Sequence, residues 1–570
     1  MPTTSPPSGG AAECRWGVTV SADANGPGTA KGRIKQAVAN SLFGTKVYDL
    51  TLGKGAPDAF VGHVRDAWPG DVTKANILFQ GRYEFAGESC TAVNEPPWAM
   101  DGSVYWKAEL HGFSWLRHFA AAGGEAARLG GRELIRTWIE GNENWDELTW
   151  RGDVMGQRLT AWAAHAAFLL EGAEPTFRKK FMAAFARQAK HLGRAVNAGP
   201  EGRARIAAIL GLTSSAIALS GGGSSLDKAM ELLQAELGQQ ILPDGGHASR
   251  SPSQHFAVLA DLISIREALA SGGHAPPGQL TSAIERLSVS ARFFRHGDGN
   301  LALFNSSNEI PTNAQGLDIT TILAVAKTKE QLPATLSQTG YERLTAAGTL
   351  VLVDVGGPPA SQFCAQAHAA PLAFEMSVGR ERLIVNCGAH RQAEWRMAGR
   401  STAAHSSLTL ADTNAIELED PFGVGKRRCD VTVNRMEDEG SIWLEAAHDG
   451  YAPFGIVHGR RYYLAATGGL KGEDTLSWEG NKNRAGHPFA VRFHLHPDVQ
   501  TSLVRDGEAV LLRLGKGKGL TFHAGGAALS LEESVYMGKG DIRRAEQIVL
   551  SGVLGNDGAV VKWAFVPVDA

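Results

Sequence analysis

The chain has 570 residues, of which 43% are hydrophobic and 20% charged, an ordinary composition for a folded protein. This length exceeds what one hydrophobic core supports, so we expect about two to four domains. The formal net charge is only −3, which excludes a broad electrostatic attraction to nucleic acid or to an acidic membrane surface. We therefore expect no nucleic-acid partner.

The N-terminal segment is rich in Pro, Ser and Gly and lacks a charged start followed by an apolar run. It predicts a disordered leader over residues 1–30 rather than a signal peptide. No apolar run long enough for a membrane span occurs in the sequence. The five cysteines are scattered without a CxxC pair, which argues against a disulfide framework and a thiolate zinc site. These features favour a cytoplasmic protein.

The first half of the chain has helical periodicity. Between about residues 100 and 330 apolar residues recur at helical spacing, for example Leu159, Trp162, Ala166 and Leu169. The pattern repeats in successive stretches, which predicts helical hairpins. We assign residues 31–335 to this helical domain.

The second half changes to a period of two. The segment "LAFEMSV" (372–378) alternates apolar and polar residues, and "GRERLIV" (379–385) returns as a second strand. Similar short runs follow, separated by Gly, Asn and Asp, which is typical of a large antiparallel sandwich. We assign residues 336–570 to this β domain.

Two polar loops interrupt the helical half. The first, "LPDGGHASRSPSQH" (242–255), carries Asp244, His247, Arg250, Gln254 and His255 between helical stretches. Its glycines and prolines break helix, and loops held by a rigid scaffold are where sites usually lie. We predict that this loop contributes to a functional site.

The second loop, "HGDGNLALFNSSNE" (296–309), contains His296, Asp298, Asn305, Asn308 and Glu309. We take Asn305, Asn308 and Glu309 as candidate substrate-binding residues. The alternative is that Asn and Asp side chains only satisfy the backbone of the turn.

The stretch "AQAHAAPLAFEMSVGRERLIVNCGAHRQAEWRMAGRSTAAHSSLTL" (365–410) resembles the C-terminal domain of the heparinase II/III family of polysaccharide lyases. That family carries a His-x-His-Ala-Asp run, an Asp-x-Gly that closes the next strand, and an Arg-x-Thr-x-Ala-His-Asn stretch. In the helical half, residues 110–123, 158–170 and the loop "DGGHASRSPSQH" resemble the family's toroid helices and catalytic loop. The resemblance spans about residues 100–460.

This resemblance implies an α+β multidomain protein, with an incomplete α/α toroid followed by an antiparallel β-sandwich. It also implies a saccharide cleft between the two and β-elimination at an acidic glycan. Elimination requires that the uronate carboxylate is neutralised, that a carbon-bound proton is removed, and that the leaving oxygen is protonated.

The sequence departs from the family at the proton-transfer positions. Gln254 stands where the family has Tyr, and Gln366 where it has the first His of His-x-His. Neither amide exchanges protons at neutral pH. Arg250 replaces the family's Glu and adds a donor suited to carboxylates.

His255 is then the best proton-transfer candidate, because imidazole titrates near neutral pH; its alternative role is to brace the loop. A hydrolase would instead need facing carboxyl groups, for which Asp244 with Asp298, or Asp244 with Glu309, are available.

The resemblance also implies a structural zinc site in the sandwich, with His368, Asn386 and His405 at the ligand positions. The Asn is a poor replacement for the family's Asp, and the alternative is a pair of hydrogen-bonded core histidines. His494 and His496 lie two apart on one strand and could also hold a metal, although a surface position is the better interpretation.

Other candidates have both a functional and a structural interpretation. Arg400 could neutralise a uronate or form a salt bridge that fixes the strand bend, and Arg396, four residues earlier, is a further candidate for substrate binding. His111 and Glu109 could line the toroid cavity or belong to one structural helix face. Arg158 is expected to anchor a carboxylate inside the helical domain.

The leading interpretation is a lyase-like enzyme acting on an acidic, uronate-type glycan or oligosaccharide. The alternatives are a glycoside hydrolase on the same scaffold and a non-catalytic saccharide-binding protein. The usual export of the family conflicts with the missing signal, so a periplasmic or cell-envelope location is the alternative to the cytoplasm. The sequence leaves the oligomeric state open.

Overall fold

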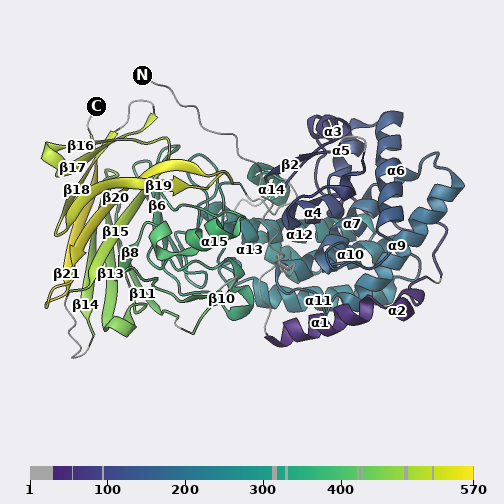
Figure 1. The fold of residues 1–570 in the computed structure, drawn as a ribbon, viewed down its shortest axis with the longest axis horizontal. Coiled ribbons are helices and arrows are strands. Elements are labelled where there is room, and N and C mark those ends of the chain that lie inside the picture. Colours follow the sequence, from purple (N-terminus) through teal and green to yellow (C-terminus); the bar gives the residue numbers. More distant parts are fainter. Residues whose placement is uncertain are drawn as a thin grey trace, which may run out of the picture.

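The computed structural model describes residues 30–568, except 54, 93–94, 311–316, 328–330, 420–422, 427, 480–485 and 516–518. The predicted leader, residues 1–30, therefore lies outside the described residues apart from Ala30. The helical half and the sheet half lie side by side along the longest axis of the molecule (Figure 1).

The N-terminal half is built from helices, with a small hairpin formed by β1 (Arg82–Phe85) and β2 (Glu88–Thr91). The helices are α1 (Ala30–Phe43), α2 (Lys46–Leu50), α3 (Val72–Phe79), α4 (Val104–Gly112), α5 (Leu116–Ala122), α6 (Gly124–Gly141), α7 (Gly152–Ala164), α8 (Ala166–Leu170), α9 (Pro175–Ala195), α10 (Arg203–Ala218), α11 (Gly223–Gln240), α12 (Pro252–Ser271), α13 (Gly278–Phe293) and α14 (Ile319–Ala326).

The helices form an inner and an outer set. Helices α10 and α12 bury residues on every face, whereas α6 and α9 bury one face each and leave the other to solvent. The inner helices α7 and α10 meet at Gly156 and Gly211. A Cβ on Gly211 would lie 2.3 Å from the Gly156 Cα, so the two glycines permit this close approach.

The C-terminal half consists of two antiparallel sheets around a common apolar core. The eight-stranded sheet has the order β11 (Val431–Asp438), β12 (Ser441–His448), β13 (Ile456–Leu464), β14 (Leu470–Trp478), β21 (Ala559–Pro567), β18 (Gly519–Gly525), β17 (Ala509–Arg513) and β16 (Gln500–Val504). The nine-stranded sheet has the order β19 (Ala528–Tyr536), β20 (Arg543–Val553), β15 (Pro488–Leu495), β7 (Glu381–Val385), β6 (Phe374–Val378), β5 (Thr349–Asp354), β4 (Tyr341–Ala346) and β3 (Thr335–Leu336), with β8 (Leu408–Leu410) paired to β15.

The nine-stranded sheet is the one that packs on the toroid. The apolar core of the helical half continues into Tyr341, Leu350 and Leu352 of β4 and β5. The last toroid helix ends at Ala326 and the first sandwich strand begins at Thr335. The predicted fold class, an incomplete α/α toroid followed by an antiparallel sandwich, is confirmed.

Among the helices that the structure describes, none has the length and apolar character needed to cross a bilayer.

Candidate functional site

Charged side chains of two toroid helices lie close to a loop of the sandwich. Tyr105 and Glu109 lie on α4 and Arg203 begins α10, while Arg391 comes from the loop that follows β7 of the sandwich. The Arg391 guanidinium lies 5.1 Å from the centre of the Tyr105 ring. These four residues, which we name the toroid mouth, therefore bring the two halves together at one polar surface.

Glu109 has an unusual protonation state for a carboxylic acid. Burial raises its pKa to about 7, although Arg391, the Ala86 amide and Arg203 each act in the opposite direction. The Ala86 N–H donates to Glu109 Oε2 at 3.2 Å. A carboxyl group that titrates near neutral pH can take up or release a proton under ordinary conditions.

Arg391 retains an unused donor. Its Nη1 atom is buried and has no hydrogen-bond partner in the described structure. Burial lowers the pKa of Arg391, yet a guanidinium stays protonated in proteins. Because a buried donor without a partner is costly, this N–H group is suited to donate to an oxygen of a bound carboxylate.

The neighbouring charges are already paired. Arg203 Nε donates to Asp261 Oδ2 at 2.8 Å, and Arg151 Nε donates to Asp153 Oδ1 at 2.6 Å. Asp261 is fully buried, and the pKa of Asp153 is lowered by Arg151 despite burial. These two carboxylates are thus matched by their own arginines, whereas Arg391 keeps an unpartnered donor and Glu109 has a raised pKa.

Gln254 and Gln366 are half-buried, and their contact with a substrate stays a prediction. The backbone N–H of Gln254 donates to the Ser251 hydroxyl, which caps α12. The backbone carbonyl of Gln366 accepts from Ser306 Oγ at 3.1 Å. Asn308 Oδ1 accepts from the Ala389 N–H at 3.2 Å, two residues before Arg391. Asn308 therefore positions the loop that carries Arg391.

Arg250 is an interdomain clamp and not a free donor in a cleft, which corrects the prediction. Its guanidinium forms an ion pair with Asp354 of β5. It also donates to the Thr339 carbonyl at 2.7 Å and to the carbonyls of Gly340, Gly356 and Gly357. Every donor is used to hold the sandwich, so none faces a substrate.

Asp244 has the same kind of role. Its carboxylate accepts from the backbone N–H groups of Gln338 and Thr339 and from the Thr339 hydroxyl, at 2.7–2.8 Å. Gly246 packs directly on Thr339, and a Cβ there would lie 1.7 Å from the Thr339 Oγ1. The glycine-rich bend therefore serves to fit the loop against the first strands of the sandwich.

The loop histidines are buried inside the toroid, which corrects the prediction that His255 is a proton-transfer residue and favours its alternative role of bracing the loop. His255 Nε2 donates to the Leu287 carbonyl at 2.8 Å, and burial lowers the pKa of His255 to about 4. His247 bonds to Gln240 and Ser249, and burial lowers its pKa to about 3. Both rings are neutral near pH 7 and brace the loop.

The second loop also joins the domains. His296 bonds to Glu375 and Ser377 of β6, and Asn305 donates to the Tyr341 hydroxyl at 2.8 Å. Glu309 accepts from the Tyr536 hydroxyl at 2.6 Å.

The hydrolase alternative needs one protonated carboxylic acid, and this loop does not supply it. Arg382 lowers the pKa of Asp298 against the effect of burial. His496 and Tyr536 lower the pKa of Glu309 to about 2, again against burial. Both carboxyl groups are ionised at neutral pH, so neither can act as the acid.

The predicted zinc ligands do not fit a metal in this arrangement. His405 Nδ1 donates to the Ser401 carbonyl at 2.7 Å, which leaves Nε2 to accept from His368 Nδ1 at 2.8 Å. His368 Nε2 accepts from the Ser306 N–H at 2.9 Å, and Asn386 bonds to Ser406 and Glu375. No imidazole lone pair is left, and the described residues contain no group of three or more metal-binding side chains.

His494 and His496 do not form a metal pair either. His494 bonds to Ser534 Oγ and the Ala403 carbonyl, whereas His496 lies near Glu309 and Asp498.

The arginines around α15 (Ala393–Arg400) have different surroundings. Arg400 is buried and donates to the carbonyls of Ala367 and Gly423. This corrects the expectation that Arg400 contacts a uronate, because its fork is directed at the main chain. Arg396 is half-buried on the same helix, and its role in substrate binding stays a prediction.

His111 and Arg158 belong to the aromatic core of the toroid. His111 Nδ1 accepts from Trp138 Nε1 at 2.9 Å, and burial lowers the pKa of His111 to about 3. Arg158 donates to Gln188 Oε1, the His111 carbonyl and the Thr149 carbonyl. The prediction that Arg158 anchors a carboxylate is wrong, because no carboxylate in the described part of the chain pairs with it.

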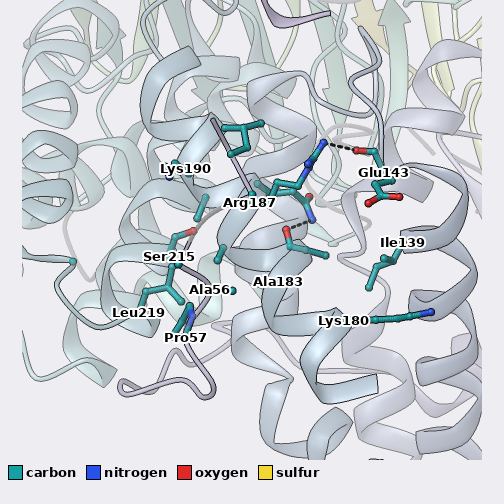
Figure 2. A pocket seen from close by; sticks show the side chains of 18 of the residues that line it. Ala56, Pro57, Ile139, Glu143, Lys180, Ala183, Arg187, Lys190, Ser215 and Leu219 are labelled. Atoms are coloured by element: carbon teal, nitrogen blue, oxygen red, sulfur yellow. Dashed lines mark hydrogen bonds between the residues drawn. The ribbon is translucent and has the colours of Figure 1, made fainter. Parts of the chain in front are cut away.

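A separate cavity of about 710 Å³ lies on the flank of the toroid. Figure 2 shows Arg187 on α9, Ser215 on α10 and Leu219 directly after α10 around it, together with Pro57. Arg187 is committed to Asp49 and to the Glu143 carbonyl. The cavity shares no lining residue with the toroid mouth.

The toroid, the sandwich and the polar mouth between them define a scaffold of the polysaccharide-lyase type. Residues 328–564 match the family model described as heparinase II/III-like, C-terminal. FtsZ-localized protein C of Caulobacter vibrioides is 31% identical over 546 residues, which is 92% of this chain and 93% of that protein. The chain belongs to the heparinase II/III-like family.

Solved structures agree on the fold. A crystal structure of heparinase III superposes with a TM-score of 0.70 at 13% identity, covering 94% of this chain and 89% of that one. Heparan sulfate lyase HepC from Pedobacter heparinus gives a TM-score of 0.58 at 15% identity, covering 95% of this chain and 88% of that one. At such identities the likeness establishes architecture alone.

Sequence reasoning missed Arg391, Tyr105 and Arg203 as site residues. Arg391 lies inside the stretch that carries the family resemblance, but it matches none of the family's motif positions. Its contact with Tyr105, on a helix of the other domain, is a property of the tertiary fold.

Proposed function

We propose that this chain binds an acidic glycan or oligosaccharide at the toroid mouth and has given up the elimination chemistry of its family. The unpartnered Nη1 of Arg391 carries the proposal, because it offers a desolvated cation to a uronate carboxylate. The residues expected to move protons support it, since Gln254 and Gln366 are amides and His255 is sealed inside the toroid.

We further propose that the chain localises with FtsZ, as the name "FtsZ-localized protein C" says of its Caulobacter relative. A glycan-binding scaffold without cleavage is compatible with such a role, because recognition alone can recruit a protein to its site of action.

Cleavage is a second candidate function, and Glu109 is the observation that favours it. A carboxyl group with a pKa of about 7 beside a guanidinium is a suitable proton-transfer group for elimination or hydrolysis. If the chain cleaves its glycan by elimination, Arg391 neutralises the uronate carboxylate, and Glu109 removes the carbon-bound proton and returns a proton to the leaving oxygen.

The binding proposal is tested by titrating the chain with a glucuronate-containing hexasaccharide and a neutral hexasaccharide of equal length, using calorimetry. We expect binding of the uronate sugar, and Arg391→Ala to weaken it by about ten-fold or more. Arg544→Ala, at an exposed position with side-chain exposure of 80%, is the matched control and should leave the affinity unchanged. Equal affinity of the wild type and Arg391→Ala would contradict the proposal.

A further inference from the structure

A second hollow lies on the outer face of the eight-stranded sheet. It has a volume of about 520 Å³ and is lined by side chains from β12, β13, β14, β21 and β18. The interdomain contacts of Arg250, His296 and Glu309 reach the nine-stranded sheet, so this face belongs to the other side of the sandwich.

The strand register explains the hollow. Trp443, Tyr463, Lys471, Ala564 and His523 lie opposite one another along one row across five neighbouring strands. Ala564 has the smallest side chain in this row. It leaves a depression beside the large rings of Trp443 and Tyr463. The depression follows from the sequence of side-chain sizes along the row.

Two aromatic rings form the apolar wall of the hollow. Trp443 is 37% exposed, and its ring centre lies 4.8 Å from that of Tyr463 at an angle of 44°. Side chains of β12 point alternately to the two faces of the sheet. Because Ile442 and Leu444 are buried in the core, the Trp443 ring between them lies on the outer surface. Exposed aromatic surface in a concave setting marks a binding site.

Charged groups of both signs surround the rings. In the adjacent row, Arg461 pairs with Glu445 at 2.7 Å and with Glu473 at 3.3 Å, and Lys562 lies 3.7 Å from Glu473. Lys471 and Lys562 are exposed at the same hollow. The rim therefore supplies hydrogen-bond donors and acceptors side by side.

We propose that this hollow is a second saccharide-binding site. A pyranose ring has an apolar C–H face that stacks on aromatic rings and a belt of hydroxyl groups that match a mixed donor and acceptor rim. The volume of the hollow is in the range of small-ligand sites. The strands that line it are flanked by paired strands, which excludes addition of a peptide strand at this position.

This second site is independent of the toroid mouth. Because stacking requires no carboxylate, it accepts neutral sugars, whereas the mouth selects uronates. Two sites on one chain would let a long glycan bind with avidity.

The test uses the full chain with Arg391→Ala, which removes the mouth from the measurement. It is titrated with cellohexaose, chitohexaose and mannohexaose by calorimetry, and the indole N–H signals are followed by NMR. We expect at least one of these sugars to bind and to shift the Trp443 signal. Trp443→Ala should weaken binding by about ten-fold.

Two further variants keep the test decisive. Ala564→Leu fills the hollow without removing an aromatic ring and should also weaken binding. Val560→Ala changes an exposed residue of the same strand, 50% exposed and outside the hollow, and should leave binding unchanged. The melting temperature of each variant reports whether the fold is retained. The proposal is overturned if none of the three sugars binds, or if Ala564→Leu binds them as the parent does.

A failure here is distinguishable from a failure at the mouth. Loss of uronate binding in Arg391→Ala with intact binding of neutral sugars supports both sites. Neutral-sugar binding that is unaffected by the hollow variants overturns only the second site.

Discussion

Replacing Arg250 by Ala should destabilise the protein and leave its glycan affinity unchanged. The change removes the ion pair with Asp354 and the donors to four backbone carbonyls, and both partners of the ion pair are under a tenth exposed. Asp354 would keep the Gly356 N–H, at 3.1 Å, and the Asn305 side chain, but no cation. Breaking such a buried pair costs about 3–5 kcal/mol, because one charge stays buried without a partner.

The assay is urea unfolding followed by tryptophan fluorescence and far-ultraviolet circular dichroism. Since Arg250 joins the toroid to the sandwich, we expect the midpoint to fall and the two probes to separate, as the domains unfold less cooperatively. Arg250→Lys keeps the charge but loses the planar fork, so its loss should be intermediate. The exposed Arg544→Ala is the control and should show no measurable change. An unchanged midpoint together with lost glycan binding would refute this account and restore Arg250 to the site.

Further predictions concern protonation and metal. The affinity for an acidic glycan should rise as the pH falls through about 7, because protonated Glu109 no longer competes for Arg391, and Glu109→Gln should flatten this profile in calorimetric titrations. The pKa of Glu309 is lowered to about 2 in the folded protein. Its ionised carboxylate therefore stabilises the fold fully above the pKa of a glutamate in the unfolded chain, about 4.3, and this stabilisation is lost as the pH falls toward 2. Between pH 5 and 2 the wild type should therefore lose about 3 kcal/mol more stability than Glu309→Gln, measured by urea unfolding. Chelation by EDTA should leave the melting temperature unchanged, since His368 and His405 bond to each other; a drop of several degrees with zinc in the purified chain would contradict this.

The predictions for Glu109 and Glu309 would each be contradicted by a specific result. A pH profile of Glu109→Gln identical to that of the wild type would remove Glu109 from the site. Equal acid sensitivity of Glu309→Gln and wild type would show that the Tyr536 contact does not stabilise the ionised carboxylate.

The fold was predictable because its signals are local. The helical spacing around Leu159 and the alternation in "LAFEMSV" each report burial of one face, and the motif stretch at 365–410 added the family architecture. The loss of the family's proton-transfer residues, replaced here by Gln254 and Gln366, could also be predicted, because aligning the motifs shows directly which residue stands at each position.

The roles of the polar loop residues could not be predicted in the same way. Arg250 and His255 have the chemistry of site residues, and only their tertiary surroundings show that one clamps the sandwich and the other is buried against Leu287. Glu109 was singled out as a lining residue, but its raised pKa depends on burial that no sequence pattern reports. Arg391 was missed because its partner Tyr105 lies in the other domain.

The most direct test of the central claim is a turnover panel of uronate-containing oligosaccharides with the wild-type chain. Ultraviolet absorbance of the unsaturated product and new reducing ends are read in parallel with calorimetric binding. We predict binding that depends on Arg391, with no signal in either product channel. Absorbance that rises with time and is lost in Glu109→Gln would contradict the binding-only account and establish elimination at the toroid mouth.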